Sequence, residues 1–165
     1  MVGTVVNGLI YSYISNAILA WGSAYKAHVD KIQNHSARLI FFATTYGEYI
    51  ESALPLVNLL DALKVHNVYR FQILKFTYLW HKGLLPKLFS NYFQYASNVH
   101  KYNTRYASKR NLYVKKVRTD TGKQTIGYDA CIAWDKIPLN LKELNVYQFS
   151  KQLKPYLLSE QHSQT

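Results

Sequence analysis

The residue types that usually carry out chemistry occur in this chain of 165 residues, but their spacing does not build an active site. Asp120-Thr121-Gly122 has the letters of the aspartic-protease triplet. That catalytic loop needs an apolar strand before it, whereas Arg118 and Lys123 flank this triplet, as they would flank a polar turn. We therefore interpret it as part of a turn and not as a protease site.

Metal, nucleotide and thiol chemistry lack support for the same reason. The six histidines show no spacing of two ligands with a carboxylate except at His28-x-Asp30, whose side chains point to opposite sides of a helix. The five aspartates stand singly along the chain, whereas a Mg²⁺ site needs clustered carboxylates, and no glycine-rich phosphate loop occurs. The single cysteine, Cys131, excludes an internal disulfide, and its apolar neighbours predict a buried, inert thiol. We expect no cofactor and no small-molecule substrate.

The pattern that does indicate a ligand is a basic segment. The chain has 20 basic and 9 acidic residues, a net charge of +11, and residues 98–123 alone hold eight of the basic and one of the acidic residues. Cations at this density can bind phosphates with release of counterions, and interleaved tyrosine and histidine rings can stack on exposed bases. The candidate nucleic-acid-binding residues are His100, Lys101, Tyr102, Arg105, Lys109, Arg110, Lys115, Lys116, Arg118 and Lys123.

Charge alone leaves other interpretations open. An acidic protein, or an acidic part of the same polypeptide, would also attract this segment. A third interpretation is that the segment is a solvated surface without a partner. His100 and Tyr102 could equally pack the segment onto the rest of the chain. A membrane partner is disfavoured because the segment lacks an amphipathic helix with basic and aromatic faces. Without a basic residue before Lys26 to mark a signal peptide, we expect an intracellular protein of the cytoplasm or nucleus, not a secreted one.

The periodicity of apolar residues predicts a mainly α fold, a helical bundle with a small basic β-hairpin or extended arm near residues 111–128. We expect a helical, thumb-like subdomain over 1–97, the basic arm over 98–128, C-terminal helices packing back over 129–158, and a disordered tail over 159–165. The predicted helices cover 5–20, 26–42, 52–63, 64–81, 86–93, 129–136 and 146–158. The predicted hairpin pairs 111–118 with 124–128 across a turn at 119–123.

The apolar pattern also predicts which faces of two of these helices are buried. In the helix at 26–42, Tyr25, Val29, Ile32, Ser36 or Ala37, and Leu39 or Ile40 are predicted to share one face. Lys31, His35 and Arg38 form a second face, either solvated or facing phosphates. The helix at 64–81 is apolar almost all round and is predicted to be the central buried helix, ended by Gly83.

A series of short motifs follows one order along residues 8–158. The series runs Trp21-Gly22, Lys31–Ile40, Leu84-Leu85-Pro86 with Leu88-Phe89 and Tyr92-Phe93, His100–Arg105, Val117-Arg118-Thr119, Gly122–Tyr128, Trp134–Pro138 and Phe149–Leu158. In this order the motifs resemble the C-terminal region, downstream of the polymerase palm, of reverse transcriptases from non-LTR (LINE-type, jockey-like) retrotransposons. The sequence departs from that family at Asp135, where asparagine is more usual, and at Ser36.

The resemblance implies an RNA-directed DNA polymerase of which this chain holds only the thumb-like and post-thumb part. The paired catalytic aspartates of the palm, and the Mg²⁺ they bind, would lie outside the chain, so the resemblance provides no catalytic residue here. It implies that residues 5–42 grip a template–primer duplex, and that His100–Arg105 helps to hold element RNA, an RNA–DNA heteroduplex or target DNA. The rest of the polymerase is a further expected partner. Two alternatives stay open: a structural segment that docks on the polymerase without binding nucleic acid, or a host-adopted small RNA- or DNA-binding protein.

Overall fold

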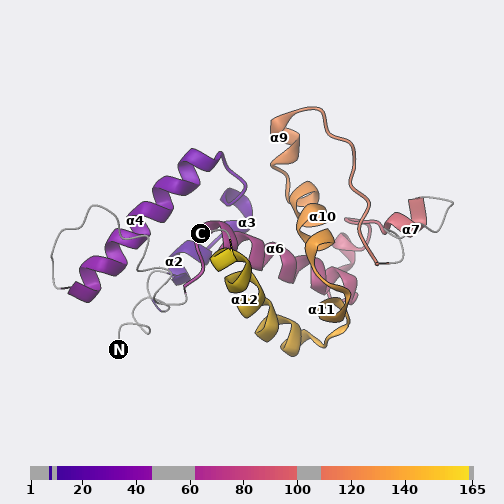
Figure 1. Cartoon of the computed structure of the whole chain (residues 1–165). Coiled ribbons are helices and arrows are strands. Elements are labelled where there is room, and N and C mark those ends of the chain that lie inside the picture. Colours follow the sequence, from indigo (N-terminus) through magenta and orange to yellow (C-terminus); the bar gives the residue numbers. More distant parts are fainter. Residues whose placement is uncertain (1–7, 9–10, 46–61, 100–108, 164–165) are drawn as a thin grey trace. The chain divides into compact units, whose positions relative to one another are not determined.

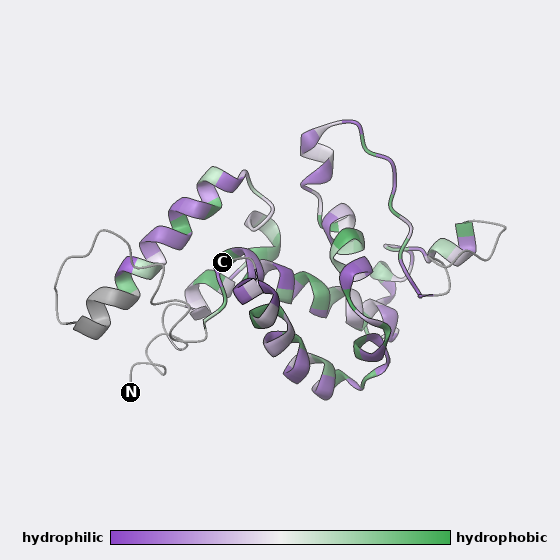
Figure 2. Ribbon diagram, in the orientation of Figure 1, coloured by the Kyte–Doolittle hydropathy of each residue, from purple (hydrophilic) through white to green (hydrophobic). Residues whose placement is uncertain are grey.

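The fold is mainly helical, which confirms the predicted class (Figure 1). The computed structural model describes Gly8 and residues 11–45, 62–99 and 109–163. The predicted helix at 52–63 therefore lies almost wholly outside the described residues. The longest helices are α4 (Lys26–Thr45), α6 (Val65–His81) and α12 (Val146–Ser163). Figure 2 shows hydrophobic and hydrophilic residues side by side along α4 and α12, as expected of helices that bury one face.

Contacts between residues divide the chain into two compact units. Unit 1 comprises Met1–Tyr69 with Lys154–Thr165, and unit 2 comprises Arg70–Leu153. The boundaries between them fall inside α6 and inside α12. They do not coincide with the subdomain boundaries that the sequence suggested after residues 97 and 128.

In unit 1, two one-turn helices lie at residues 12–21, where the sequence predicted part of a single helix. Helices α2 (Ser12–Ser15) and α3 (Ile18–Trp21) are separated at Ala17, whose φ of 52° is in the left-handed region. A residue with a Cβ adopts this conformation rarely, and a right-handed helix cannot continue through it. The predicted stop at Trp21-Gly22-Ser23 is confirmed, because α3 ends at Trp21.

Helix α4 confirms the predicted helix, but its buried face matches the predicted one only in part. The buried side chains are Val29, Gln33, Ser36 and Ala37. Of these, Val29, Ser36 and Ala37 belong to the predicted face, whereas Tyr25 and Ile32 of that face are exposed. Of the alternatives Leu39 or Ile40, Leu39 is exposed, and the burial of Ile40 is not described. Neighbouring positions lie about 100° apart around a helix, so burial of Gln33 turns Ile32 outward. Lys31, His35 and Arg38 are all exposed, as expected for the second face.

The burial of Gln33 has a structural reason at the start of α6. The first backbone N–H groups of a helix have no partner inside the helix and need an acceptor elsewhere. Gln33 Oε1 accepts a hydrogen bond of 2.6 Å from the N–H of Val65, and Gln161 Oε1 of α12 accepts one of 2.9 Å from the N–H of Lys64. Gln161 Oε1 also accepts from Asn67 Nδ2 over 3.0 Å. Two glutamines distant in sequence thus cap this helix.

Unit 2 is built around the remaining part of α6, which confirms that this is a buried helix. The rings of Tyr78 on α6 and Phe149 on α12 stack with their centroids 4.0 Å apart, and the Tyr78 hydroxyl donates to the carbonyl of Leu144. The other large, fully buried side chains of this unit are Ile73, Leu74, Leu112, Trp134, Lys142 and Leu153. Gly83 ends the helix as predicted: its φ is +68°, and the N–H of Leu84 bonds back to the carbonyl of Leu79.

Short elements follow α6. The helical stretch predicted over 86–93 is reduced to the 3-10 turn η2 (Lys87–Phe89), after which comes α7 (Ala96–Val99). The basic segment ends in α9 (Asp120–Lys123), and α10 (Ile126–Lys136) and α11 (Leu139–Glu143) follow it.

The predicted β-hairpin is not confirmed. Residues 113–118 have no regular structure, and α10 already begins at Ile126, where the return strand was expected. Two threonines explain the difference, because each caps a helix: Thr119 accepts from the N–H of Gly122 and Thr125 from the N–H of Tyr128. The alternative in the prediction, an extended arm, describes residues 113–118 better than the hairpin does.

Helix α12 is longer than predicted. It continues through Pro155 and past Leu158 to Ser163, where the sequence suggested an early end and a disordered tail. Proline removes a backbone donor and normally kinks or ends a helix. The buried side chains of Leu157 and Gln161 lie beyond the proline, and their packing keeps this part of the chain helical.

Candidate nucleic-acid interface

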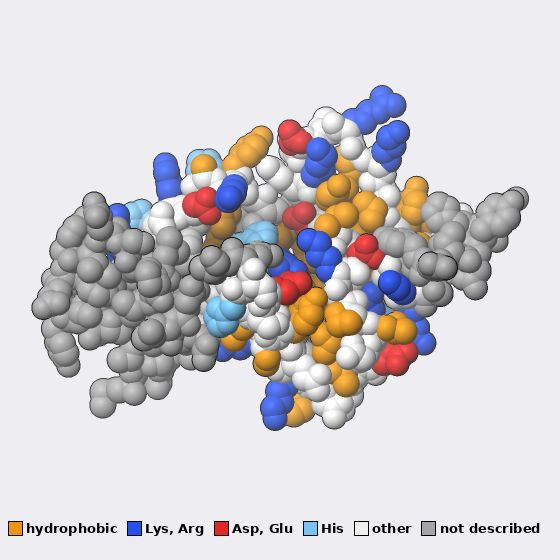
Figure 3. All heavy atoms as spheres, in the orientation of Figure 1, with side chains coloured by type: hydrophobic (Ala, Val, Ile, Leu, Met, Phe, Trp, Pro, Cys, Tyr) orange, Lys and Arg blue, Asp and Glu red, His pale blue; other side chains and the backbone are white. Residues whose placement is uncertain are grey.

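The predicted binding residues fall into two groups. His100, Lys101, Tyr102 and Arg105 lie outside the described residues. The other six, Lys109, Arg110, Lys115, Lys116, Arg118 and Lys123, are all exposed. Figure 3 shows Lys and Arg side chains projecting from unit 2 at α9 and the segment before it.

Both ends of the stretch 97–110 are held together by backbone contacts. Tyr95 and Leu112 form an isolated antiparallel bridge, and the N–H of Tyr113 donates to the carbonyl of Gln94 over 2.7 Å. The carbonyl of Arg110 accepts a hydrogen bond of 3.1 Å from the indole N–H of Trp134. Within unit 2, these contacts fix residues 110–113, from which the described part of the basic segment continues.

Lys142, a buried lysine that was not among the predicted site residues, adds further contacts to residues 109 and 111. The side chain of Lys142 is 1% exposed, and its ammonium donates to Asn111 Oδ1 over 2.8 Å and to the carbonyl of Lys109 over 3.3 Å. The same ammonium lies 5.1 Å from the centroid of the Trp134 ring, which favours a cation. Burial lowers the pKa of Lys142 to about 8. Lysines are rarely buried, so the sequence does not predict a buried Lys142. The one signal for its burial is its position between Leu141 and Leu144.

His81 at the end of α6 is a second titratable group near these residues, in contact with Tyr95 and Trp134. Its Nδ1 lies 2.6 Å from the Tyr95 hydroxyl, and its ring centroid lies 5.4 Å from that of Trp134. Burial lowers the pKa of His81 to about 4, helped by the positive charges of Lys82, Arg110 and Lys142. The imidazole is therefore neutral near pH 7, and it acts here as a structural group.

Three cations occupy the extended stretch that follows. Lys115, Lys116 and Arg118 are exposed, whereas Val117 between them is half-buried against α9. Gly122 allows this packing, because a Cβ at that position would lie 2.2 Å from Val117 Cγ1. The side chain of Val117 therefore packs against α9, while its charged neighbours Lys116 and Arg118 face solvent.

Lys123 differs from these cations because it already has a partner. Its ammonium forms an ion pair of 2.9 Å with Asp120 across one turn of α9. The hydrogen bond that Lys123 donates to Asp120 raises the pKa of Lys123. Of the six predicted residues that the structure describes, Lys123 is therefore the one whose charge is least available to a phosphate.

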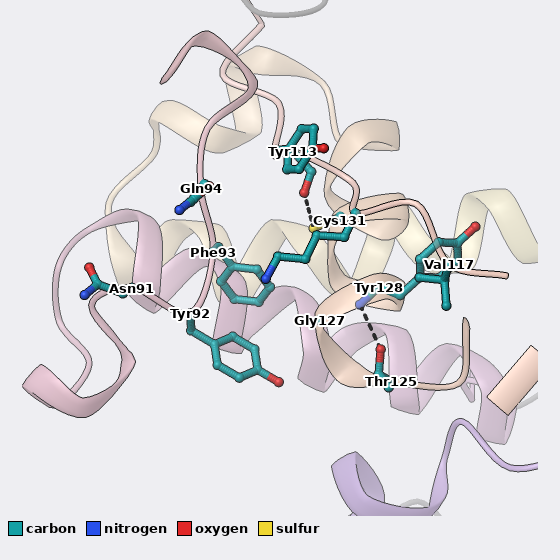
Figure 4. Close-up of a pocket in the computed structure, with 11 residues that line it drawn as sticks. Asn91, Tyr92, Phe93, Gln94, Tyr113, Val117, Thr125, Gly127, Tyr128 and Cys131 are labelled. Atoms are coloured by element: carbon teal, nitrogen blue, oxygen red, sulfur yellow. Dashed lines mark hydrogen bonds between the residues drawn. The ribbon is translucent and has the colours of Figure 1, made fainter. Parts of the chain in front are cut away.

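A pocket of about 420 Å³ opens beside this stretch (Figure 4). Its lining comes from three segments: the residues after η2, the extended stretch around Tyr113 and Lys115, and the start of α10. Tyr92, Tyr113 and Tyr128 contribute rings, and Cys131 lies at its inner wall. The thiol donates to the carbonyl of Tyr113 over 3.5 Å, and burial raises its pKa to about 11. The buried position predicted for this cysteine is confirmed.

Within the described ranges, no group of three or more His, Cys, Asp or Glu side chains could hold a metal ion. No helix of the same residues is long and apolar enough to cross a membrane. Comparison of the chain with protein-family models, curated proteins and solved structures found no match.

Proposed function

We propose that this chain binds nucleic acid through its basic segment, as the C-terminal part of a non-LTR retrotransposon reverse transcriptase. The observation that carries the binding proposal is the stretch 109–118. It contains five cations and no acidic residue, and all five cations are exposed. Phosphate neutralisation by such cations supplies most of the affinity of sequence-independent binding.

The way the segment is held also supports binding. Tyr113 is fixed to Gln94, and Val117 is packed against Gly122, so Lys115, Lys116 and Arg118 lie on a short length of chain anchored at both ends. Cations that are already positioned lose less conformational entropy when they meet a phosphate. No ion pair joins these three side chains to another residue in the described part of the chain.

The polymerase origin rests on the order of motifs in the sequence. It predicts that genomic DNA upstream of this chain, in the same frame, encodes a palm with two adjacent aspartates. Sequencing that region tests the origin independently of binding. An upstream frame without such a pair contradicts the origin and favours a host-adopted binding protein.

Mobility-shift titration of the purified chain tests the binding itself. The probes are single-stranded RNA, a DNA duplex and an RNA–DNA heteroduplex of equal length, at about 50 mM and about 200 mM salt. We expect shifted complexes at the lower salt and a marked loss of affinity at the higher one. Absence of any complex at the lower salt would leave the docking alternative, in which the segment contacts only the rest of the polymerase.

A further inference from the structure

The pocket beside Lys115 points to a more specific ligand. We propose that it takes one unpaired base of a single-stranded nucleic acid while the cations beside it hold the flanking phosphates. This inference rests on the proposed function, and it specifies which form of nucleic acid is preferred. The volume of about 420 Å³ lies within the roughly 300–1,000 Å³ of small-molecule pockets.

Tyr92 is the ring best suited to stack on a base. It is 44% exposed, so one part of the ring is open. The remainder packs edge-to-face against Phe76, Phe89 and Phe93, with centroid distances of 5.9, 6.0 and 4.8 Å. A ring that is held in place and open to solvent loses little entropy on stacking, and every base offers it a π face.

The polar groups around the opening match the rest of a nucleotide. Lys115 lines the pocket and is exposed, as a phosphate ligand must be. Asn91 and Gln94 also line it and are exposed; their amides can both donate to and accept from the edge of a base. Bases in a duplex have their faces stacked and their edges paired, so only an unpaired base can use this combination.

Gly127 keeps the pocket open on the side of α10. A Cβ there would lie 3.9 Å from the Tyr92 hydroxyl oxygen, which is ordinary van der Waals contact. Alanine would therefore fit, whereas the longer side chain of methionine would extend from that point into the space beside the ring. This gives a variant that fills the pocket without removing the ring.

Fluorescence anisotropy with a uridine oligonucleotide and a DNA duplex of equal length tests the proposal. We expect the wild-type chain to bind the single strand more tightly, and Tyr92→Ala to weaken single-strand binding by roughly tenfold while duplex binding is unchanged. Tyr147→Ala is the matched control, because Tyr147 is a 74% exposed tyrosine on α12 of the same unit. It should change neither affinity.

Gly127→Met provides a second test if Tyr92→Ala does not fold, as judged by circular dichroism. It should lower single-strand affinity like Tyr92→Ala, whereas Gly127→Ala should leave it unchanged. Equal affinity for single strand and duplex, or no effect of Gly127→Met, overturns the pocket while nucleic-acid binding stands. If the wild type binds neither probe, the proposed function itself fails. Competition by uridine monophosphate as strong as by the oligonucleotide would assign the pocket to a free nucleotide and also overturn the inference.

Discussion

The ammonium of Lys142 donates a hydrogen bond of 2.8 Å to Oδ1 of Asn111, and both side chains are almost fully buried in unit 2. Asn111 in turn accepts from the N–H of Ala96 through its backbone carbonyl, at 3.0 Å. Lys142 on α11 is thereby linked through Asn111 to Ala96, which lies in the segment before the basic stretch. Lys142 is thus a structural lysine, in contrast to the exposed lysines that we propose to contact phosphates.

Replacing Lys142 with methionine should destabilise the protein. Methionine keeps the length of the side chain, but it leaves Asn111 Oδ1 and the carbonyl of Lys109 without this donor. A buried polar group that loses its partner costs about 1–3 kcal/mol. Urea denaturation at pH 7 should show a lower free energy of unfolding for Lys142→Met, while the exposed control Lys151→Met stays near the wild-type value. Equal stability of the wild type and Lys142→Met would contradict the anchoring role.

The same lysine should make stability depend on alkaline pH. Its pKa is about 8 in the folded chain against 10.5 as the ordinary value, so between these values the unfolded state binds more protons. The free energy of unfolding should therefore rise with pH in this window, relative to Lys142→Met. Denaturation curves of both proteins from pH 7 to 10 measure the difference, and a difference that stays constant or falls with pH would contradict this account.

His81 should cause a loss of stability in acid. Its pKa is lowered from 6.5 to about 4 because burial and nearby cations disfavour the imidazolium. The unfolded state then takes up a proton below pH 6.5 that the folded state refuses, so the contribution of His81 to stability is complete above pH 6.5 and is lost as the pH falls toward 4. Thermal unfolding temperatures between pH 7 and pH 4 should fall less steeply for His81→Gln, which cannot titrate. Parallel profiles would show that His81 is not the group responsible.

Gly22 should tolerate no larger side chain. A Cβ at this position would lie 2.4 Å from Cδ2 of the buried Tyr69 ring and 2.7 Å from the backbone oxygen of Ile18. Overpacking of this kind costs about 1–3 kcal/mol. Chemical denaturation of Gly22→Ala should show this loss, while Gly127→Ala, whose new Cβ meets only ordinary contacts, should be unchanged or more stable. Wild-type stability of Gly22→Ala would mean that Tyr69 does not pack there.

The parts of the fold that the sequence predicted well are those set by local patterns. Helix α6 has a dense apolar run and a glycine whose φ of +68° ends it, and both signals are local. The face of α4 that was predicted wrongly depends on a partner distant in the sequence. Gln33 is buried because it caps α6, and that need is not visible in the pattern of α4 itself.

Some features of the candidate site could be predicted from the sequence, and others could not. The exposed cations Lys115, Lys116 and Arg118 could be predicted from composition, since charged residues are exposed by default. The pocket could not, because Tyr92 and Gly127 meet only after the chain has folded. The hairpin prediction failed because Thr119 and Thr125, which begin helices, were interpreted as turn and strand residues.

Binding through the basic segment is tested by the salt dependence of single-stranded RNA binding by a charge-reversed variant. In the variant, Lys115, Lys116 and Arg118 are each replaced by glutamate. The matched control reverses the charge of three exposed lysines elsewhere, Lys87, Lys151 and Lys154, so that both proteins have the same net charge.

Each phosphate contact on a single strand contributes about 0.7 to the slope of log affinity against log salt. We expect the reversal of Lys115, Lys116 and Arg118 to weaken binding and to lower the magnitude of this slope by about 2, whereas the control keeps a slope close to that of the wild type. Equal slopes in the two variants would contradict it, because the charge would then act from the whole surface and not from the basic segment.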